Sequence, residues 1–237
     1  MSIAPHPDEA HEARLAQRLN NLRAAVLGAN DGIVSEAGLV IGVAGATTAR
    51  APLLTAGLAG LAAGAVSMAL GEYVSVSSQR DAERDQLALE RRELAEDPAG
   101  ELAELAALYQ AKGLSPATAR RVAEELTAAD ALTAHAEAEL HLDPKDLVDP
   151  IRAAVASAVS FTLGAAIPLL AITLPAPQWR VRVAVTVVLA TLTVAGLLVA
   201  RVGGGRPGRA VLRVLVGGSI GLAFTHLVGH LAGVATG

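Results

Sequence analysis

The sequence predicts an all-α integral membrane protein with five transmembrane helices and a three-helix insert between the second and the third. Of its 237 residues, 52% are hydrophobic, and the mean hydropathy of +0.45 is too apolar for an ordinary soluble domain. The apolar residues form runs that are long enough, as helices, to cross a hydrocarbon core of roughly 30 Å. The insert is different, because 17 acidic and seven basic residues fall between Asp81 and Asp149.

Composition and motifs argue against several classes of protein. The chain has no cysteine, which excludes disulfides, thiolate metal sites and cysteine nucleophiles. The net charge of −10 between Asp81 and Asp149 repels nucleic acid and attracts cations. No glutamate is followed three residues later by a histidine, as a di-iron oxidase requires, and the sequence has neither a phosphate-binding glycine loop nor a nucleophile elbow. We therefore expect neither an enzyme nor a prosthetic group.

The first element is a polar cytoplasmic segment, residues 1–21, with a short amphipathic helix over 7–20. It lacks the apolar core and small-residue cleavage site of a signal peptide. The first span follows over 22–46 and contains Asp31 and Glu36. A carboxylate at such a depth is costly unless it faces protein or a water-lined interior, so it marks a functional candidate.

The second element is one long helix over 53–96. No proline occurs between Pro52 and Pro98, and alanine, leucine, glutamate and arginine favour a helix throughout. Its nearly charge-free first part, to residue 79, is the predicted second span, so that residues 22–79 hold transmembrane helices one and two. The remainder carries a row of carboxylates into water.

Residues 80–150 predict a cytoplasmic, metal-binding helical domain. Its first helix is the extension of the second span, and two further helices follow. Four pairs of residues mark where helices end or begin: Asp97-Pro98, Lys112-Gly113, Ser115-Pro116 and Asp143-Pro144.

Residues 151–237 hold the last three predicted spans, over 151–174, 181–202 and 210–233. None of these spans contains a carboxylate. Five spans place the two termini on opposite sides of the membrane. Arginines are concentrated in the segments that share a side with the N-terminus, so the positive-inside rule predicts a cytoplasmic N-terminus and insert, with the C-terminus outside. We expect the membrane to be a bacterial inner membrane.

Acidic residues recur at helical spacing in the insert. Three groups share a helix face: Glu83, Glu90 and Glu93 on the extended helix, Glu101 and Glu104 after Pro98, and His135 with Glu139 on the last helix. Brought together, these side chains would form an oxygen-rich cage for a divalent cation. The alternative is that they are solvated helix faces, partly paired with neighbouring arginines.

The first two spans carry polar residues on defined faces. Met68 and Glu72 lie on one face of the second span, and Asp31 and Ser35 on one face of the first. A thioether together with carboxylates can replace part of the hydration shell of a transition-metal ion without trapping it. Simple packing for Met68 and a structural role for Asp31 are the alternatives. Because a lone bundle has little means to shield these polar faces, they predict a homodimer.

Two motifs, GANDG over 28–32 and SMALGEYVSV over 67–76, resemble those of the vacuolar iron transporter family. The order of the elements from Leu22 onward is similar as well, and the chain resembles a bacterial member. The resemblance implies five spans per subunit and a dimer with the ion path at its interface. It also implies a cytoplasmic three-helix domain that binds metal through glutamates, and movement of Fe²⁺ out of the cytosol in exchange for protons.

The resemblance also assigns residues. The family's pathway aspartate and methionine match Asp31 and Met68, and Glu72 falls within the second motif. The metal-binding glutamates of the insert match Glu90, Glu93, Glu101, Glu104 and Glu139. Where the family often has methionine on the last insert helix, this chain has His135, which joins the predicted ligands and leaves the metal preference of the insert open.

The leading functional hypothesis is proton-coupled transport of Fe²⁺, with Mn²⁺ as a second candidate ion. Carboxylates must release protons to bind a cation, which gives the exchange a physical basis. A non-transporting metal buffer or sensor and a passive divalent-cation channel are the alternatives. The expected partners are divalent metal ions, protons, the lipid bilayer and a second copy of the chain.

Overall fold

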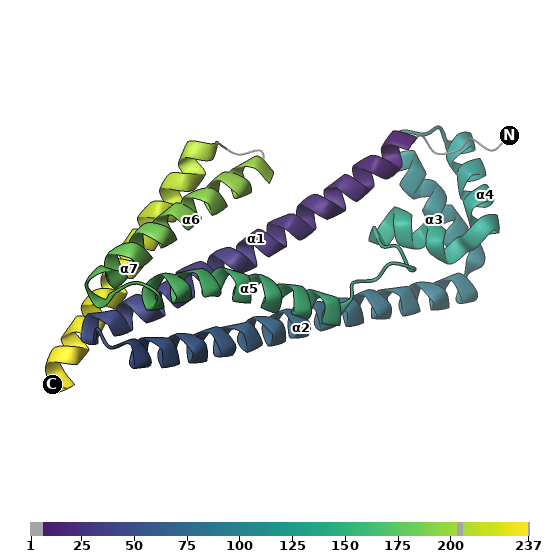
Figure 1. Cartoon of the computed structure of the whole chain (residues 1–237). Coiled ribbons are helices and arrows are strands. Elements are labelled where there is room, and N and C mark those ends of the chain that lie inside the picture. Colours follow the sequence, from purple (N-terminus) through teal and green to yellow (C-terminus); the bar gives the residue numbers. More distant parts are fainter. Residues whose placement is uncertain (1–6, 203–205, 237) are drawn as a thin grey trace. The chain divides into compact units, whose positions relative to one another are not determined.

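A computed structural model describes the backbone of residues 7–202 and 206–236, and the side chains of residues 25–26, 28–201 and 206–235. Helices joined by short loops account for the regular structure of these residues, which contain no strand (Figure 1). The predicted all-α class is therefore confirmed.

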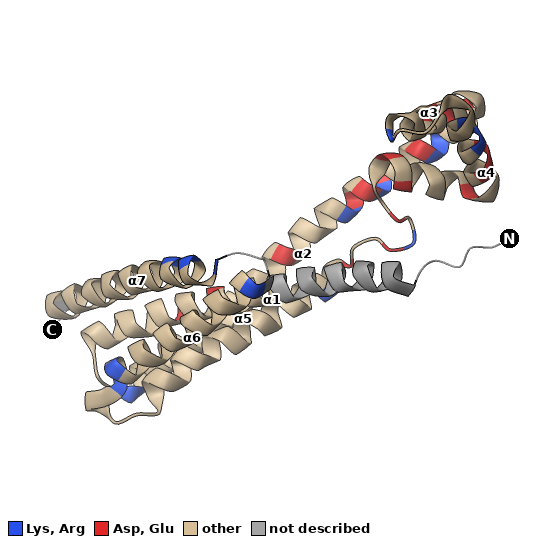
Figure 2. Cartoon of the chain, turned by 90° about the horizontal axis from the view of Figure 1, so that it is seen from above, with Lys and Arg blue, Asp and Glu red and all other residues tan. Residues whose placement is uncertain are grey.

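The chain divides into two compact units, each with its own hydrophobic core. The membrane unit comprises Met1–Glu72 and Ala153–Gly237, and the insert unit comprises Tyr73–Arg152. Helix α2 (Arg50–Glu96) contributes its first residues to the membrane unit and the remainder to the insert unit. The acidic side chains are concentrated on the insert unit, whereas the helices of the membrane unit carry few charges (Figure 2).

The other helices of the membrane unit are long and mostly apolar. They are α1 (Pro7–Ala46), α5 (Pro150–Thr173), α6 (Arg180–Val202) and α7 (Pro207–Thr236), with a short 3₁₀ turn η2 (Pro177–Trp179) before α6. The predicted separate helix over 7–20 is wrong, because α1 continues through it without a break. No proline follows Pro7 until Pro52, so nothing in the covalent chain interrupts this helix.

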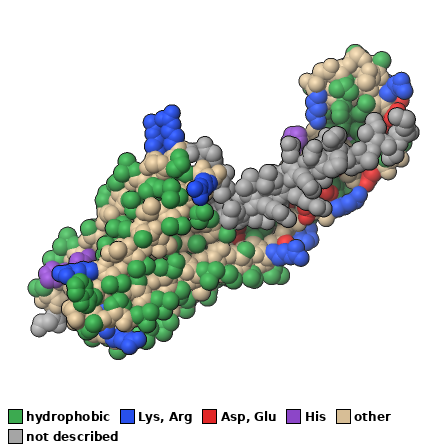
Figure 3. Space-filling model, turned by 45° about the horizontal axis from the view of Figure 1, so that its top comes forward, with side chains coloured by type: hydrophobic (Ala, Val, Ile, Leu, Met, Phe, Trp, Pro, Cys, Tyr) green, Lys and Arg blue, Asp and Glu red, His purple; other side chains and the backbone are tan. Residues whose placement is uncertain are grey.

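Four helices within the described residues are long and apolar enough to cross a membrane. They contain the segments Arg50–Glu96, Pro150–Thr173, Pro177–Arg201 and Pro207–Ala235. The predicted first span, over 22–46 in α1, lies partly outside the residues whose side chains the structure describes. Large apolar side chains such as Leu163 and Phe224 are exposed on the membrane unit, and hydrophobic atoms cover much of its visible surface (Figure 3). This surface suits lipid better than water.

Helix α1 is held by close backbone packing. It contacts α6 and α7, and glycines bring it against α5 and α7 as well. A Cβ atom at Gly164 would overlap the carbonyl of Ala29, and one at Gly229 would overlap the carbonyl of Gly42. Only glycine permits such approaches, which fix the rotation of α1 and hence the direction of its polar side chains.

The insert unit contains the second part of α2, α3 (Pro98–Ala111), α4 (Pro116–His135) and a π-helical turn η1 (Ala136–Leu140). The predicted break at Pro98 is confirmed, and the Asp97 side chain caps α3 by accepting a hydrogen bond from Gly100 N at 2.9 Å. Ser115 caps α4 in the same way, as predicted. The core is small, since its buried members are one leucine and four alanines, so the three helices pack closely.

Candidate functional site

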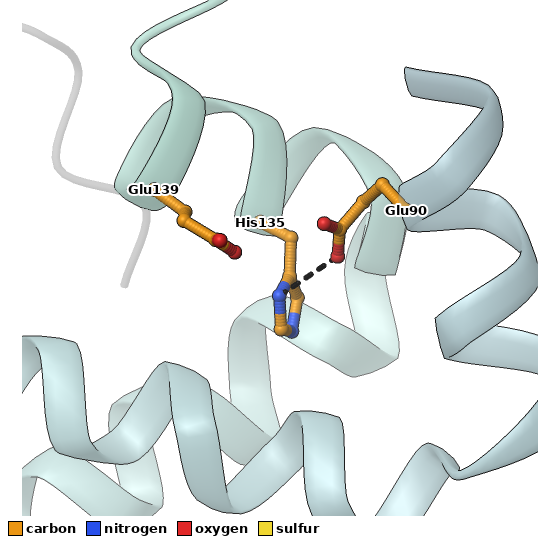
Figure 4. A group of neighbouring side chains, drawn as sticks. All are labelled: Glu90, His135 and Glu139. Carbon is orange, nitrogen blue, oxygen red and sulfur yellow. Dashed lines mark ion pairs between the residues drawn. The ribbon is translucent and has the colours of Figure 1, made fainter. Parts of the chain in front are cut away.

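Three side chains converge in the insert unit and form what we call the insert cluster: Glu90 from α2, His135 from the end of α4 and Glu139 from η1 (Figure 4). One ligand atom from each lies within 4.8 Å of the others. His135 Nδ1 is 3.0 Å from Glu90 Oε1 and 3.5 Å from Glu101 Oε2. One imidazole and several carboxylates are a donor set that borderline divalent cations accept.

Local structure explains how these residues meet. His135 is the last residue of α4 and Glu139 lies in η1, so the wider π-helical turn sets the direction of the second side chain relative to the first. Such turns are frequent at functional sites. Glu101 lies in the first turn of α3, which the Asp97 cap starts directly after the end of α2. The short connections therefore bring three helices to one point.

The insert cluster concentrates negative charge in a partly dry environment. Burial, and after it the negative charges of four other glutamates, raise the pKa of Glu90 from its ordinary value of 4.5 to about 7: Glu139, Glu101, Glu93 and Glu104. Burial, followed by the charge of Glu104, also raises the pKa of Glu101. A bound cation would offset the repulsion between carboxylates that contributes, after burial, to these raised pKa values.

Three buried polar atoms of the insert cluster make no hydrogen bond within the described residues. Glu90 is 3% exposed and His135 is 0% exposed. These atoms are Glu90 Oε1 and both ring nitrogens of His135, and the 3.0 Å contact between Glu90 Oε1 and His135 Nδ1 is an ion pair if the imidazole is protonated. Buried polar atoms without partners are costly, and a metal ion would satisfy Glu90 Oε1 together with one ring nitrogen of His135.

The structure thus brings together only part of the predicted ligand set of the insert. Glu90, His135 and Glu139 meet, and Glu101 lies beside His135. Glu93 and Glu104 are exposed and lie outside the three-residue group, although their charges act on Glu90.

A pocket of about 280 Å³ opens in the membrane unit, and we call it the membrane pocket. Three helices line it: α1 with Asp31, Ser35, Glu36 and Leu39, α2 with Gly60, Gly64, Ser67 and Met68, and α5 with Phe161. The structure therefore brings Asp31 and Met68 to one pocket from different helices. Ser35 Oγ donates a hydrogen bond to Asp31 Oδ1 at 3.3 Å, and both residues are exposed on the single chain.

Glu72, the third predicted pathway residue, is exposed and does not line the membrane pocket. It follows Met68 by one helical turn, and this spacing was the reason for predicting the two residues on one face of the helix. The other walls of the pocket come from α1 and α5.

Glu36 lines the membrane pocket but was not among the predicted site residues. It is five residues from Asp31, which is not a same-face spacing, so helix periodicity does not group the two carboxylates. Its position as a carboxylate within a predicted span marked it as a functional candidate, but nothing in the sequence placed it with Asp31 and Met68. In the structure Glu36 is 2% exposed, and no hydrogen-bond donor in the described part of the chain contacts its Oε1.

Comparisons with known proteins give one consistent result. The family model described as the VIT family matches residues 22–230. The chain is 43% identical to a vacuolar iron transporter of Acanthamoeba castellanii over 212 residues, covering 89% of this chain and 78% of the relative. It is 37% identical to vacuolar iron transporter homolog 1 of Oryza sativa over 230 residues, covering 96% and 81%. Vacuolar iron transporter homolog 2.1 of Arabidopsis thaliana is 35% identical over 219 residues, covering 92% and 84%.

Proposed function

Because the chain belongs to the VIT family of membrane transporters, we propose that it moves Fe²⁺ out of the cytosol in exchange for protons. The relatives' printed names support iron as the transported ion, and Mn²⁺ is a second candidate on chemical grounds. The proposal is for a transporter, and it assigns no reaction chemistry to the protein.

One observation carries the proposal, namely the meeting of Asp31 and Met68 in the membrane pocket. A carboxylate supplies charge to an ion that has lost water, and a thioether supplies a soft donor suited to transition metals. Apolar helices surround these groups, so their energetic cost is understandable if they serve an ion pathway. Glu72, one turn further along α2, would serve an approaching ion from an exposed position.

The insert cluster would capture the ion before transport. Its excess of carboxylates attracts cations, and the raised pKa of Glu90 means that near neutral pH a metal ion and a proton compete for the same oxygen. Metal affinity should therefore fall as the pH falls below about 7. Glu93 and Glu104 would act mainly by attraction, since both are exposed.

We propose that α1 supplies a fifth span, with the N-terminus and the insert on the cytoplasmic side of a bacterial inner membrane. The arginine distribution supports this orientation. Single cysteines at Gln110 and at residue 236 should react with impermeant reagents from opposite sides. Labelling of both cysteines from one side would rule out the five-span arrangement.

We also propose a homodimer. Asp31 and Ser35 are exposed on a helix of the membrane unit, where lipid would meet a carboxylate unless something covers it. A second copy related by a two-fold axis would cover both residues and double the ligand set. Mass measurement in a mild detergent should give twice the chain mass, and a monomer alone would contradict the proposal.

The transport proposal is tested by Fe²⁺ uptake into proteoliposomes with and without an imposed pH gradient. An antiporter moves Fe²⁺ faster when the gradient drives protons in the opposite direction. Uptake that ignores the gradient would instead indicate a passive channel. Absence of uptake by folded protein that still binds Fe²⁺ would indicate a buffer or sensor.

A further inference from the structure

Glu36 is the most deeply buried carboxylate in the described part of the membrane unit. It lies on α1, is 2% exposed and lines the membrane pocket with Asp31 and Met68. None of the described residues donates a hydrogen bond to its Oε1. A structural carboxyl group in an apolar bundle normally has a donor, because an unpaired buried oxygen costs free energy. Glu36 therefore lacks the contacts that would explain it as part of the scaffold.

Two glycines of α2 make room for this carboxylate. A Cβ atom at Gly57 would lie 2.8 Å from Glu36 Oε1, and one at Gly60 would lie 3.1 Å from Glu36 Oε2. Both distances are shorter than ordinary contacts, so a larger residue at either position would displace the carboxylate. Gly60 also lines the membrane pocket, which places the Glu36 carboxylate beside the space that an ion would occupy.

Charge explains why a second carboxylate is useful there. Within one chain, a divalent cation held by Asp31 alone keeps one net positive charge among apolar helices. The cost of a net charge in a medium of low dielectric constant is large, whereas a paired charge costs far less. Glu36 supplies the second negative charge, so that an ion between the two carboxylates is electrically compensated.

We propose that Glu36 is a ligand of the transported divalent cation, acting with Asp31 and Met68 in the membrane pocket. The inference rests on the proposed transport function and extends it to a third ligand. The pocket of about 280 Å³ also leaves room for several waters on the ion, since each takes about 30 Å³ in the liquid. Two carboxylates and a thioether then complete the coordination without enclosing the ion fully.

Uptake of Fe²⁺ into proteoliposomes is the first test, using the full chain and the variants Glu36→Gln and Glu36→Asp. Glu36→Gln keeps the shape and removes the charge, so Vmax/KM for Fe²⁺ should fall at least tenfold. Glu36→Asp keeps the charge but shortens the reach, and should give an intermediate value. Glu124→Gln is the matched control, because Glu124 is an exposed glutamate of the insert unit paired with Arg120, and it should transport at the unmodified rate. Unchanged Vmax/KM in Glu36→Gln would overturn the proposal.

A binding measurement separates this inference from the transport proposal. The measurement uses the full chain in detergent with Glu90→Gln and Glu139→Gln, which together weaken Mn²⁺ binding by the insert cluster. Equilibrium dialysis then reports the Mn²⁺ that binds at other sites of the chain. Adding Glu36→Gln should weaken this remaining binding at least tenfold, which a purely structural Glu36 would not do. If the unmodified protein moves no Fe²⁺, the transport proposal is refuted. Glu36 as a metal ligand is refuted by a different result, namely an unchanged Mn²⁺ affinity when Glu36→Gln is added. Should Glu36→Gln fail to fold, Glu36→Asp must weaken Mn²⁺ binding several-fold, and unchanged binding would overturn the proposal.

Discussion

Replacing Glu90 by glutamine should make the metal-free insert unit more stable at alkaline pH while weakening its metal binding. Glu90 is buried, and its charge is opposed both by the loss of water and by neighbouring glutamates. Glutamine has nearly the same shape and no charge. The variant therefore removes an unfavourable charge from the metal-free state and removes a ligand from the metal-bound state.

The pKa of Glu90 sets the size and the pH range of this effect. Folding raises the pKa from 4.5 to about 7, so the folded state holds the proton more tightly than the unfolded state does. The stabilisation from this proton is complete below about pH 4.5, declines as the pH rises, and is lost above about pH 7. At about 1.4 kcal/mol per pKa unit, the loss is roughly 3 kcal/mol, or about a hundredfold in the opening equilibrium.

Amide hydrogen exchange measures this quantity directly, since it reports the free energy of opening for individual helices of the full chain. The backbone amides of α3 and α4 should exchange up to about a hundredfold more slowly in Glu90→Gln than in the unmodified chain at pH 8 with a chelator present. At pH 5 the difference should shrink to a small fraction of this, because Glu90 is then mostly protonated. Each comparison is made at one pH, so intrinsic exchange rates cancel. Glu124→Gln, an exposed change on α4, should have no effect.

Two results would refute the reasoning. Equal or faster exchange in Glu90→Gln at pH 8 without metal would mean that the Glu90 charge does not strain the insert unit. Equal protection of both proteins by added Mn²⁺ would mean that Glu90 is not a ligand, because a ligand's loss reduces the stabilisation that binding provides.

The remaining predictions concern the membrane unit and the edge of the insert cluster. Asp31→Ala and Met68→Ala should each lower Fe²⁺ uptake by proteoliposomes more than tenfold, since water cannot easily replace a ligand among apolar helices. Folded variants that transport at the unmodified rate would exclude the proposed pathway through the membrane pocket. Glu104→Ala should reduce uptake without eliminating it, because the residue is exposed and other carboxylates remain; complete loss would show a direct role. Gly229→Ala should destabilise the bundle by about 1–3 kcal/mol, because its methyl group would overlap an α1 carbonyl. Gly221→Ala, which meets nothing within 4 Å, should be neutral or stabilising by up to about 1 kcal/mol, and equal melting temperatures of these two variants in detergent would contradict the packing argument.

The sequence predicted those features that depend on the chain itself. The all-α class follows from apolar runs and helix-forming residues, and the helix break at Pro98 follows from a ring that cannot continue a helix. The helix starts at Asp97 and Ser115 also depend on local sequence, because a capping hydrogen bond joins groups only three residues apart. The acidic insert was evident from composition alone.

Helix spacing predicted only part of the arrangement of each site. It shows which residues share a face of their own helix, but it does not show which other helix that face meets. Asp31 and Met68 were predicted on separate faces, and contacts between α1, α2 and α5 decided that they share a pocket. Glu72 has the same spacing to Met68 as residues that do meet, yet it lies outside that pocket.

Burial was decided only by the tertiary structure. Glu90 and Glu93 are three residues apart on one helix, and packing against α4 and η1 buries the first while the second remains exposed. On α1, Glu36 is buried and Asp31 is exposed, although the sequence suggests equal depth for both carboxylates. The reason is that burial depends on the rotation of a helix against its neighbours. That rotation is fixed by contacts between residues far apart in the chain, such as Gly229 against Gly42, which local spacing does not encode.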